Sequence, residues 1–221
     1  QQQTSRGVTC SRTTTRSVGT ERLSLKEYIM IKEKVILTDC DGVLLDWEYH
    51  FHRWMAKKGF EKNNKVSYKV DEMYDISRTE SKHIIKHFNE SAEIAFLSPL
   101  RDAIKYVRKL HEEHGYVFHC ITSLSNNPAA QELRKKNLEN VFGNVFEEYV
   151  ILGCGYDKDE ALEPYRDTGC YWVEDKIENA DLGHTLGLHS LLVGHSHNGD
   201  YKGPVTRVHD WKSIYNIITG E

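Results

Sequence analysis

The stretch VILTDCDGVLLDWEYHFHRW, which runs from Val35 to Trp54, decides the fold because it joins a strand to a pair of acids. The apolar run from Val35 to Leu37 predicts a buried strand, and Asp39 and Asp41 follow directly after it. Asp and Gly are common in turns, so the pair could simply end the strand with an Asx-type turn. Two neighbouring carboxylates are also tolerated when a divalent cation lies between them. The stretch therefore predicts either a turn or a cation site.

The rest of the chain alternates between apolar segments and helical patterns. We expect further strands at 116–122, 148–152, 170–173 and 189–193, with a short edge strand at 205–208. Capping residues predict helix starts at Ser98-Pro99, Asn127-Pro128 and Asp210. Near-continuous apolar strands that alternate with amphipathic helices are typical of a parallel sheet covered on both faces. The expected fold class is α/β, with a Rossmann-like, doubly wound parallel sheet.

One segment interrupts this alternation. Residues 46–98 contain no convincing strand and two helical patterns, roughly at 47–58 and 79–90. An insertion directly after the first strand would lie over the strand ends like a lid, although its apolar stripe could equally be ordinary packing. We expect a helical cap at 46–98 and a core domain formed by 30–45 and 99–221. Residues 1–29 are rich in Ser, Thr and Arg, which predicts a flexible tail, a targeting segment or a cloning remnant.

Composition limits the classes of function. The five cysteines form no C-x-x-C pair and their number is odd, which favours reduced thiols in an intracellular protein. Residues 1–29 carry a net charge of +3 and the remainder −7, and an acidic body does not suit long nucleic acid. No apolar run approaches the ~18 residues that a membrane span needs. We expect a cytoplasmic monomer or homodimer that binds a small molecule, unless residues 1–29 direct it to an organelle.

Hydroxyl, acidic and basic side chains also follow other predicted strands. Thr122 and Ser123 end the second strand, and Glu174 and Asp175 follow the fourth. Lys158 lies between these strands and precedes a helical pattern. Because the carboxyl ends of parallel strands meet at one edge of a sheet, where ligands bind, we expect these side chains to converge there. Such a set can hold a divalent cation, a phosphoryl group and a nucleophile.

The order of these motifs resembles that of the haloacid dehalogenase superfamily, over about residues 33–218. The match consists of D-x-D-G-V-L from Asp39 to Leu44, a strand ending at Thr122, then Lys158, then a strand before Glu174-Asp175. A dehalogenase normally lacks the second aspartate, and DCDGV is not the D-K-T-G-T of cation-pumping ATPases. The resemblance therefore implies the phosphatase branch of the superfamily, with a helical cap, Mg²⁺ as cofactor and a small phosphomonoester as substrate.

The resemblance also implies a role for each motif. Asp39 would be the nucleophile that forms an aspartyl-phosphate, and Asp41 the acid and base. Thr122 would hydrogen-bond the phosphoryl oxygens, and Lys158 would offset their charge, with Lys135 and Lys136 as weaker alternatives for that position. The expected metal ligands are the Asp39 carboxylate, the Asp41 carbonyl and Asp175, with Glu174 bound directly or through water. The expected substrate-binding residues are Thr122, Ser123, Lys158, Gly42 and Trp47.

Two subfamily resemblances leave the substrate open. DGVLLDWEYHFHRW resembles the start of the cap in β-phosphoglucomutase-type proteins, whereas MYDIS, HFNES, FLSPLRDAIKYVRKL, ITSLSNNP and YDKDEAL…YWVEDKIENA are similar to 5′(3′)-deoxyribonucleotidases over more of the chain. A nucleotide is the leading expectation, with Trp47 facing the substrate and Trp54 packing inside the cap. The alternatives are a sugar phosphomutase or sugar-phosphate phosphatase, and a catalytically inactive phosphate-binding module.

Overall fold

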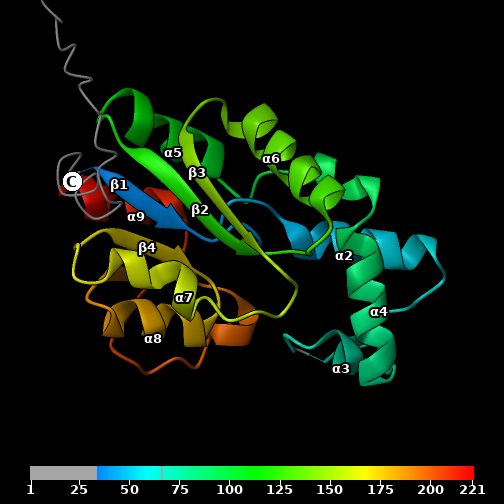
Figure 1. The fold of residues 1–221 in the computed structure, drawn as a ribbon. Helices are drawn as coiled ribbons and strands as arrows, with labels where there is room; N and C mark the ends of the chain where they lie inside the picture. The colour runs from blue at the N-terminus through cyan, green and yellow to red at the C-terminus, as the bar shows by residue number, and fades with distance from the viewer. Residues whose placement is uncertain (1–33, 66) are drawn as a thin grey trace, which may run out of the picture.

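A computed structural model of the chain describes residues 34–65 and 67–221, so the tail predicted at 1–29 lies outside the described residues. Its centre is a six-stranded sheet in which every neighbouring pair is parallel, in the order β3-β2-β1-β4-β5-β6 (Figure 1). The strands are β1 (Val35–Thr38), β2 (Val117–Ser123), β3 (Phe146–Leu152), β4 (Tyr171–Glu174), β5 (His189–Val193) and β6 (Thr206–Val208). The predicted strands, edge strand and α/β class are confirmed.

Apolar side chains fill both faces of the sheet. On β1, Ile36 belongs to one hydrophobic cluster, and its neighbour Leu37 belongs to a second cluster on the opposite face. The first cluster is covered by α5 (Ala103–Glu112), α6 (Pro128–Phe142) and α9 (Trp211–Thr219). The second is covered by α7 (Asp159–Leu162), η2 (Glu163–Tyr165) and the segment that follows α8 (Ile177–Thr185). Covering on both faces explains why the central strands read as continuous apolar runs.

Two of the three predicted helix starts are confirmed. The Asn127 side chain accepts a hydrogen bond from Ala129 N, with Pro128 at the first helical position of α6. The Asp210 side chain accepts one from Ser213 N and begins α9. Both contacts satisfy backbone N–H groups that have no partner within the helix.

The predicted start at Ser98-Pro99 is wrong, because α5 begins at Ala103. Backbone hydrogen bonds tie this segment to the chain after β1: Leu100 N donates to Leu44 O at 2.8 Å, and Asp46 N donates to Ser98 O at 2.9 Å. These bonds hold residues 98–100 extended, so that the helix cannot form there. Backbone hydrogen bonding to the segment after β1 therefore overrides the helix-start signal of Ser98-Pro99.

The segment between β1 and α5 is helical. It contains α2 (Trp47–Lys57), α3 (Val70–Tyr74), α4 (Arg78–Asn89) and η1 (Ala92–Phe96), and no strand is present in its described residues. The helices expected at 47–58 and 79–90 are confirmed, and α3 is a further helix. In Figure 1 these helices lie together at the right of the view, away from α9. None of the described helices is long and apolar enough to cross a membrane.

The inserted helices are joined to the loop after β2. The Asn89 amide, at the end of α4, donates to Leu124 O at 3.1 Å, and the Ser125 hydroxyl donates to Glu90 at 2.5 Å.

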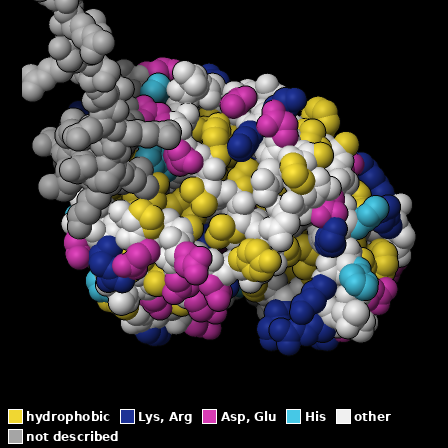
Figure 2. All heavy atoms as spheres, viewed as in Figure 1, with side chains coloured by type: hydrophobic (Ala, Val, Ile, Leu, Met, Phe, Trp, Pro, Cys, Tyr) yellow, Lys and Arg dark blue, Asp and Glu magenta, His cyan; other side chains and the backbone are white. Residues whose placement is uncertain are grey.

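Figure 2 shows acidic side chains gathered at the lower left and basic side chains at the lower right, over α3, with a hollow between them. The insertion and the sheet therefore face each other across a recess.

Candidate active site

A cavity of about 550 Å³ lies at the carboxyl ends of the strands. The strand ends and the loops that follow them contribute Asp39, Asp41, Gly42, Ser123, Lys158, Glu174 and Asp175 to its lining. The inserted segment contributes, among others, Trp47, Tyr68, Val70, Met73, Ile85 and Asn89. These residues therefore lie around one cavity, whereas Thr122 is not among its lining residues, and the insertion forms the other wall of the same cavity.

Lys158 bridges two of the acids. Its Nζ lies 2.8 Å from Asp39 Oδ1 and 2.8 Å from Glu174 Oε2, and the residue is only 2% exposed. Burial lowers the pKa of Lys158, but the two carboxylates more than offset this effect, and the pKa lies above its ordinary value. Lys158 is thus held between two carboxylates that favour its charged form, directly before α7 as the sequence predicted.

Glu174 accepts hydrogen bonds at both carboxylate oxygens. Oε1 accepts from the backbone N–H groups of Asp175 and Lys176, each at 3.0 Å. Oε2 accepts from Lys158 Nζ at 2.8 Å and from the Asn179 amide at 3.1 Å. Burial raises the pKa of Glu174, but Lys158 and these donors bring it below its ordinary value. Glu174 is therefore ionised and fixed in place.

Asp39 and Asp175 lack comparable compensation. One carboxylate oxygen from each of Asp39, Glu174 and Asp175 lies within 4.8 Å of the other two. Burial raises the pKa of Asp39 to about 6 although Lys158 opposes this effect, and burial together with Glu174 and Asp39 raises the pKa of Asp175 well above its ordinary value. Carboxylate oxygens are the ligands that Mg²⁺ and Ca²⁺ prefer. The surplus of negative charge and the donor type both fit a hard divalent cation.

Gly42 allows the two acidic loops to approach each other closely. It has a φ of +73°, which favours glycine, and a Cβ at this position would lie 2.5 Å from Asp175 Oδ2. Any side chain here would push Asp175 away from Asp39 and Asp41. Glycine is required at this point of the chain for both reasons.

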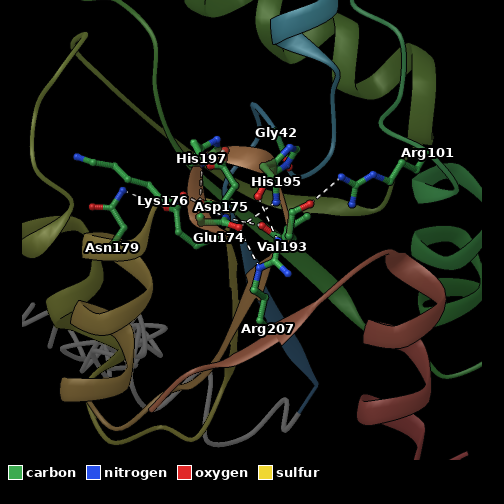
Figure 3. A network of polar contacts seen from close by, with 12 residues as sticks. Gly42, Arg101, Glu174, Asp175, Lys176, Asn179, Val193, His195, His197 and Arg207 are labelled. Atoms are coloured by element: carbon green, nitrogen blue, oxygen red, sulfur yellow. Dashed lines mark hydrogen bonds and ion pairs between the residues drawn. The ribbon is translucent and has the colours of Figure 1, made fainter. Parts of the chain in front are cut away.

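The loop after β5 fixes the same two acidic segments through their carbonyls (Figure 3). His195 Nε2 donates to Gly42 O at 2.7 Å, and a carbonyl can only accept, so Nε2 carries the proton. Asn198 donates to Asp175 O at 2.8 Å, and His197 Nε2 donates to the same oxygen at 3.2 Å. This loop thereby sets the spacing between the first and fourth motifs.

Two arginines donate hydrogen bonds to oxygen atoms of that loop. Arg101 Nη2 donates to Gly194 O at 2.8 Å, and Arg207 donates to His195 O and to Asn198 Oδ1, each at 3.1 Å. Sequence reasoning missed this network. The pattern that predicted the other site residues, polar side chains directly after a strand, could also have found this network, because polar residues follow the fifth predicted strand.

Asp41 forms an ion pair with Arg134, which sequence reasoning also missed. Arg134 Nη1 lies 2.7 Å from Asp41 Oδ1, and Nη2 donates to Asp41 Oδ2 at 3.1 Å. The Arg134 side chain is fully buried, whereas that of Asp41 is 23% exposed and reaches the cavity. Burial raises the pKa of Asp41 and Arg134 opposes this rise. The helical spacing of Arg134 could have indicated that it is buried, because it shares the buried face of α6 with Ala130 and Leu138.

The lysines beside Arg134 do not reach the cavity. Lys136 Nζ lies 3.6 Å from Glu132 on the exposed face of α6, and Lys135 Nζ lies over the ring of Tyr149. Neither residue belongs to the cavity lining. Lys158 is therefore the better candidate for the third motif.

The two hydroxyls at the end of β2 differ in placement. Ser123 lines the cavity, and its hydroxyl donates to Tyr156 O at 3.2 Å. Thr122 is 1% exposed and lies outside the lining, and its hydroxyl has no hydrogen-bond partner among the described residues. Successive side chains of a strand point to opposite faces, so the two hydroxyls point in opposite directions. The phosphate-binding role expected of Thr122 stays a prediction, and Ser123 has the more direct access.

The two tryptophans of α2 also have different surroundings. Trp47 lines the cavity, donates from Nε1 to Asn89 Oδ1 at 2.9 Å and stacks on Phe51 with ring centroids 4.5 Å apart. Trp54 is 8% exposed, lies outside the lining and packs on Phe51 and Phe88. One ring thus borders the cavity, and the other lies inside the inserted segment.

The raised pKa of Asp39 predicts a pH-dependent effect on stability in the absence of metal. A carboxyl whose pKa rises from 3.8 to about 6 on folding favours the folded state below the lower value, and that contribution is lost as the pH rises through the higher one. The side chain of Asp39→Asn cannot ionise. The free energy of unfolding of this variant should therefore increase relative to that of wild type between pH 4 and pH 7, by roughly 2 kcal/mol. Urea unfolding in chelator at both pH values measures this gain. No relative gain would contradict the shift.

No protein-family model matches the chain. An uncharacterised 32.4 kDa protein encoded in the Gp30–rIII intergenic region of Enterobacteria phage T4 is 25% identical over 196 residues. The match covers 83% of this chain and 69% of the phage protein. The name of this relative carries no statement about activity.

Solved structures share the fold. CbbY from Rhodobacter sphaeroides, solved with phosphate, is 12% identical with a TM-score of 0.53, covering 83% of this chain and 96% of CbbY. YfnB from Bacillus subtilis, assigned to the HAD hydrolases and bound to magnesium, is 12% identical with a TM-score of 0.53, covering 84% and 98%. Protein Tyrosine Kinase A of Mycobacterium tuberculosis is 13% identical with a TM-score of 0.58, covering 84% and 97%. These likenesses show that the chain has the haloacid dehalogenase-like fold.

Proposed function

We propose that this chain, which has the fold of the haloacid dehalogenase-like hydrolases, is a Mg²⁺-dependent phosphatase that cleaves a small phosphomonoester through an aspartyl-phosphate. The observation that carries the proposal is the Lys158 bridge between Asp39 and Glu174, beside Asp175, in a cavity large enough for a small substrate. Asp39, Asp41, Lys158 and Asp175 all line that cavity, which favours an enzyme over an inactive binding module.

The acidic residues would hold the metal. The carboxylates of Asp39 and Asp175, together with the Asp41 carbonyl, are the proposed Mg²⁺ ligands. Glu174 already accepts four hydrogen bonds, so its proposed role is to fix Lys158 and to contribute charge, with any contact to the metal made through water. When bound, the ion would offset the charge of phosphate beside these carboxylates.

The proposed chemistry uses two carboxylates in turn. An oxygen of Asp39 attacks phosphorus, the bond to the leaving oxygen breaks, and Asp41 gives that oxygen a proton. Asp41 then takes a proton from water, whose oxygen attacks phosphorus and releases Asp39. Lys158 favours the ionised form of Asp39 and offsets the phosphoryl charge, and Ser123 offers a hydroxyl in the lining of the same cavity. Catalysis of this type depends mainly on positioning and charge neutralisation.

We further propose that residues 46–98 act as the cap and select the substrate. Support comes from the cavity, whose wall opposite the carboxylates is formed by this segment. The aromatic rings of Trp47, Tyr68 and Tyr156 belong to the lining, and such rings bind nucleobases by stacking. A 5′-nucleotide is therefore the proposed substrate class.

Trp47→Ala and Trp54→Ala should have different effects. Trp47→Ala should lower kcat/KM for nucleotides by ~10-fold or more and leave a small aryl phosphate nearly unaffected, since stacking contributes ~1–3 kcal/mol per base. Trp54→Ala should lower the free energy of unfolding by ~3–5 kcal/mol and affect all substrates alike. Kinetics on both substrates and thermal melts measure the difference. Uniform losses in both variants would mean that Trp47 serves packing alone.

A substrate screen tests the proposed function. The purified protein is assayed with Mg²⁺ against nucleoside monophosphates, hexose phosphates, phosphoglycolate and an aryl phosphate, with release of inorganic phosphate and isomerisation of the hexose phosphates as the two readouts. Hydrolysis that is fastest on nucleotides is the expected profile. A preference for hexose phosphates would replace the nucleotide by a sugar phosphate, isomerised hexose phosphate without phosphate release would indicate a mutase, and no turnover of any compound would contradict the enzyme class.

A further inference from the structure

The ion pair between Arg134 and Asp41 is asymmetric in its exposure to the cavity. Asp41 is partly exposed at the cavity wall, and the guanidinium lies fully buried behind it. Two guanidinium nitrogens meet the two carboxylate oxygens, at 2.7 and 3.1 Å, so the plane of the carboxylate is fixed as well as its position. Each oxygen keeps a lone pair that can still serve a substrate.

Arg134 is itself held rigidly. The helix α6 that carries it begins at the Asn127 cap, directly after the loop that follows β2. One turn beyond Arg134, the Asn137 side chain accepts from Leu97 N at 2.8 Å and donates to Leu97 O at 3.0 Å. The helix is thus tied to both the sheet and the inserted segment, and the guanidinium has little freedom to move.

A contribution to the stability of the fold does not by itself explain why an arginine is buried at position 134. Removing two charges from water costs about as much as their mutual attraction returns, and a well-packed apolar pair at such a site is often as stable. Within the described residues, Asp41 is the one carboxylate at ion-pair distance from Arg134. The neighbours of Arg134 on the same helix face, Ala130 and Leu138, are apolar, as a purely structural position would be.

We propose that Arg134 is a positioning residue that aims the Asp41 carboxyl at the leaving-group oxygen. This inference rests on the proposed phosphatase function and adds to it a residue that does not touch the substrate. Because Arg134 contacts both oxygens of its carboxylate, Asp41 cannot rotate away from the cavity when a substrate enters. Loss of Arg134 should therefore impair the transfer of a proton to the leaving group more than the attack by Asp39.

The test compares two leaving groups in the Arg134→Met variant. A nitrophenyl phosphate releases a stable phenolate that needs little protonation, whereas an alkyl phosphate releases a poor leaving group that needs it fully. General acid catalysis contributes ~10²–10⁴-fold, so kcat/KM for the alkyl phosphate should fall by ~100-fold or more, and that for the nitrophenyl phosphate by no more than ~10-fold. Arg134→Lys should recover part of the selective loss.

Controls separate positioning from folding. Asp41→Asn should show the same selectivity, and Asp41→Asn combined with Arg134→Met should show no further selective loss while removing both members of the buried pair. Lys136→Met, at an exposed position of the same helix, should behave as wild type. Equal losses on both substrates in a folded Arg134→Met variant would overturn the inference, whereas absence of hydrolysis by wild type would contradict the proposed function instead.

Discussion

Asp39→Asn is expected to abolish phosphomonoester hydrolysis, with turnover lowered ~10⁴-fold or more. The substitution keeps the shape of the side chain, but an amide oxygen lacks the charge that attack on phosphorus requires. It also leaves Lys158 paired with Glu174, so the ammonium group stays compensated and the fold should persist. Because the buried carboxyl at position 39 opposes folding when ionised, the variant should be at least as stable as wild type near neutral pH.

Steady-state assays of Asp39→Asn with the best substrate of the screen measure this loss. Asp75→Asn is a matched control, because Asp75 is exposed on the inserted segment and lies outside the cavity lining. That variant should retain wild-type turnover. An Asp39→Asn variant that is folded and hydrolyses substrate at a near-normal rate would remove Asp39 from the role of nucleophile.

Removal of divalent metal is expected to have the second large effect. Three carboxylates within 4.8 Å of one another repel a phosphate dianion, and Lys158 alone does not balance them. A chelator should therefore reduce hydrolysis to background, and Mg²⁺ added beyond the chelator should restore it. Chelator that has been saturated with Mg²⁺ beforehand is the control. Full activity in metal-free chelator would contradict a metal-dependent mechanism.

Metal binding should also be visible without any assay of activity. A ligand that binds only the folded state raises the free energy of unfolding, by ~2.7 kcal/mol at ~100 times its Kd. Mg²⁺ should therefore raise the Tm of wild type and of Asp75→Asn, and should raise that of Asp175→Asn much less. An equal rise in all three proteins would place the ion elsewhere.

The sheet and most of the site follow from periodicity and from one topological rule. The predicted strands are found because central strands of a covered parallel sheet are continuous apolar runs, as in β1. Asp39, Lys158 and Asp175 meet because the carboxyl ends of such strands share one edge. Their convergence could be predicted without knowledge of any tertiary contact, because the rule needs only the positions of the strands.

The features that were not predicted depend on contacts between distant segments. Arg134 resembles a solvated residue in a charged run, and only the packing of α6 turns it toward Asp41, 93 positions away. His195 reaches Gly42 across 153 positions. The helix start expected at Ser98-Pro99 fails for the same reason, since Leu44 and Asp46 hold that segment extended. Local sequence patterns carry no information about such pairings.

Trapping the covalent intermediate tests the central claim most directly. Wild type is mixed with substrate and Mg²⁺, quenched in acid within the first turnovers and reduced with borohydride, which converts an aspartyl-phosphate to homoserine. Peptide mass spectrometry then locates the change, with Asp39→Asn as the matched control. The account predicts homoserine at position 39 in wild type and none in the variant. Homoserine at another aspartate, or phosphate release with no modified aspartate at all, would contradict it.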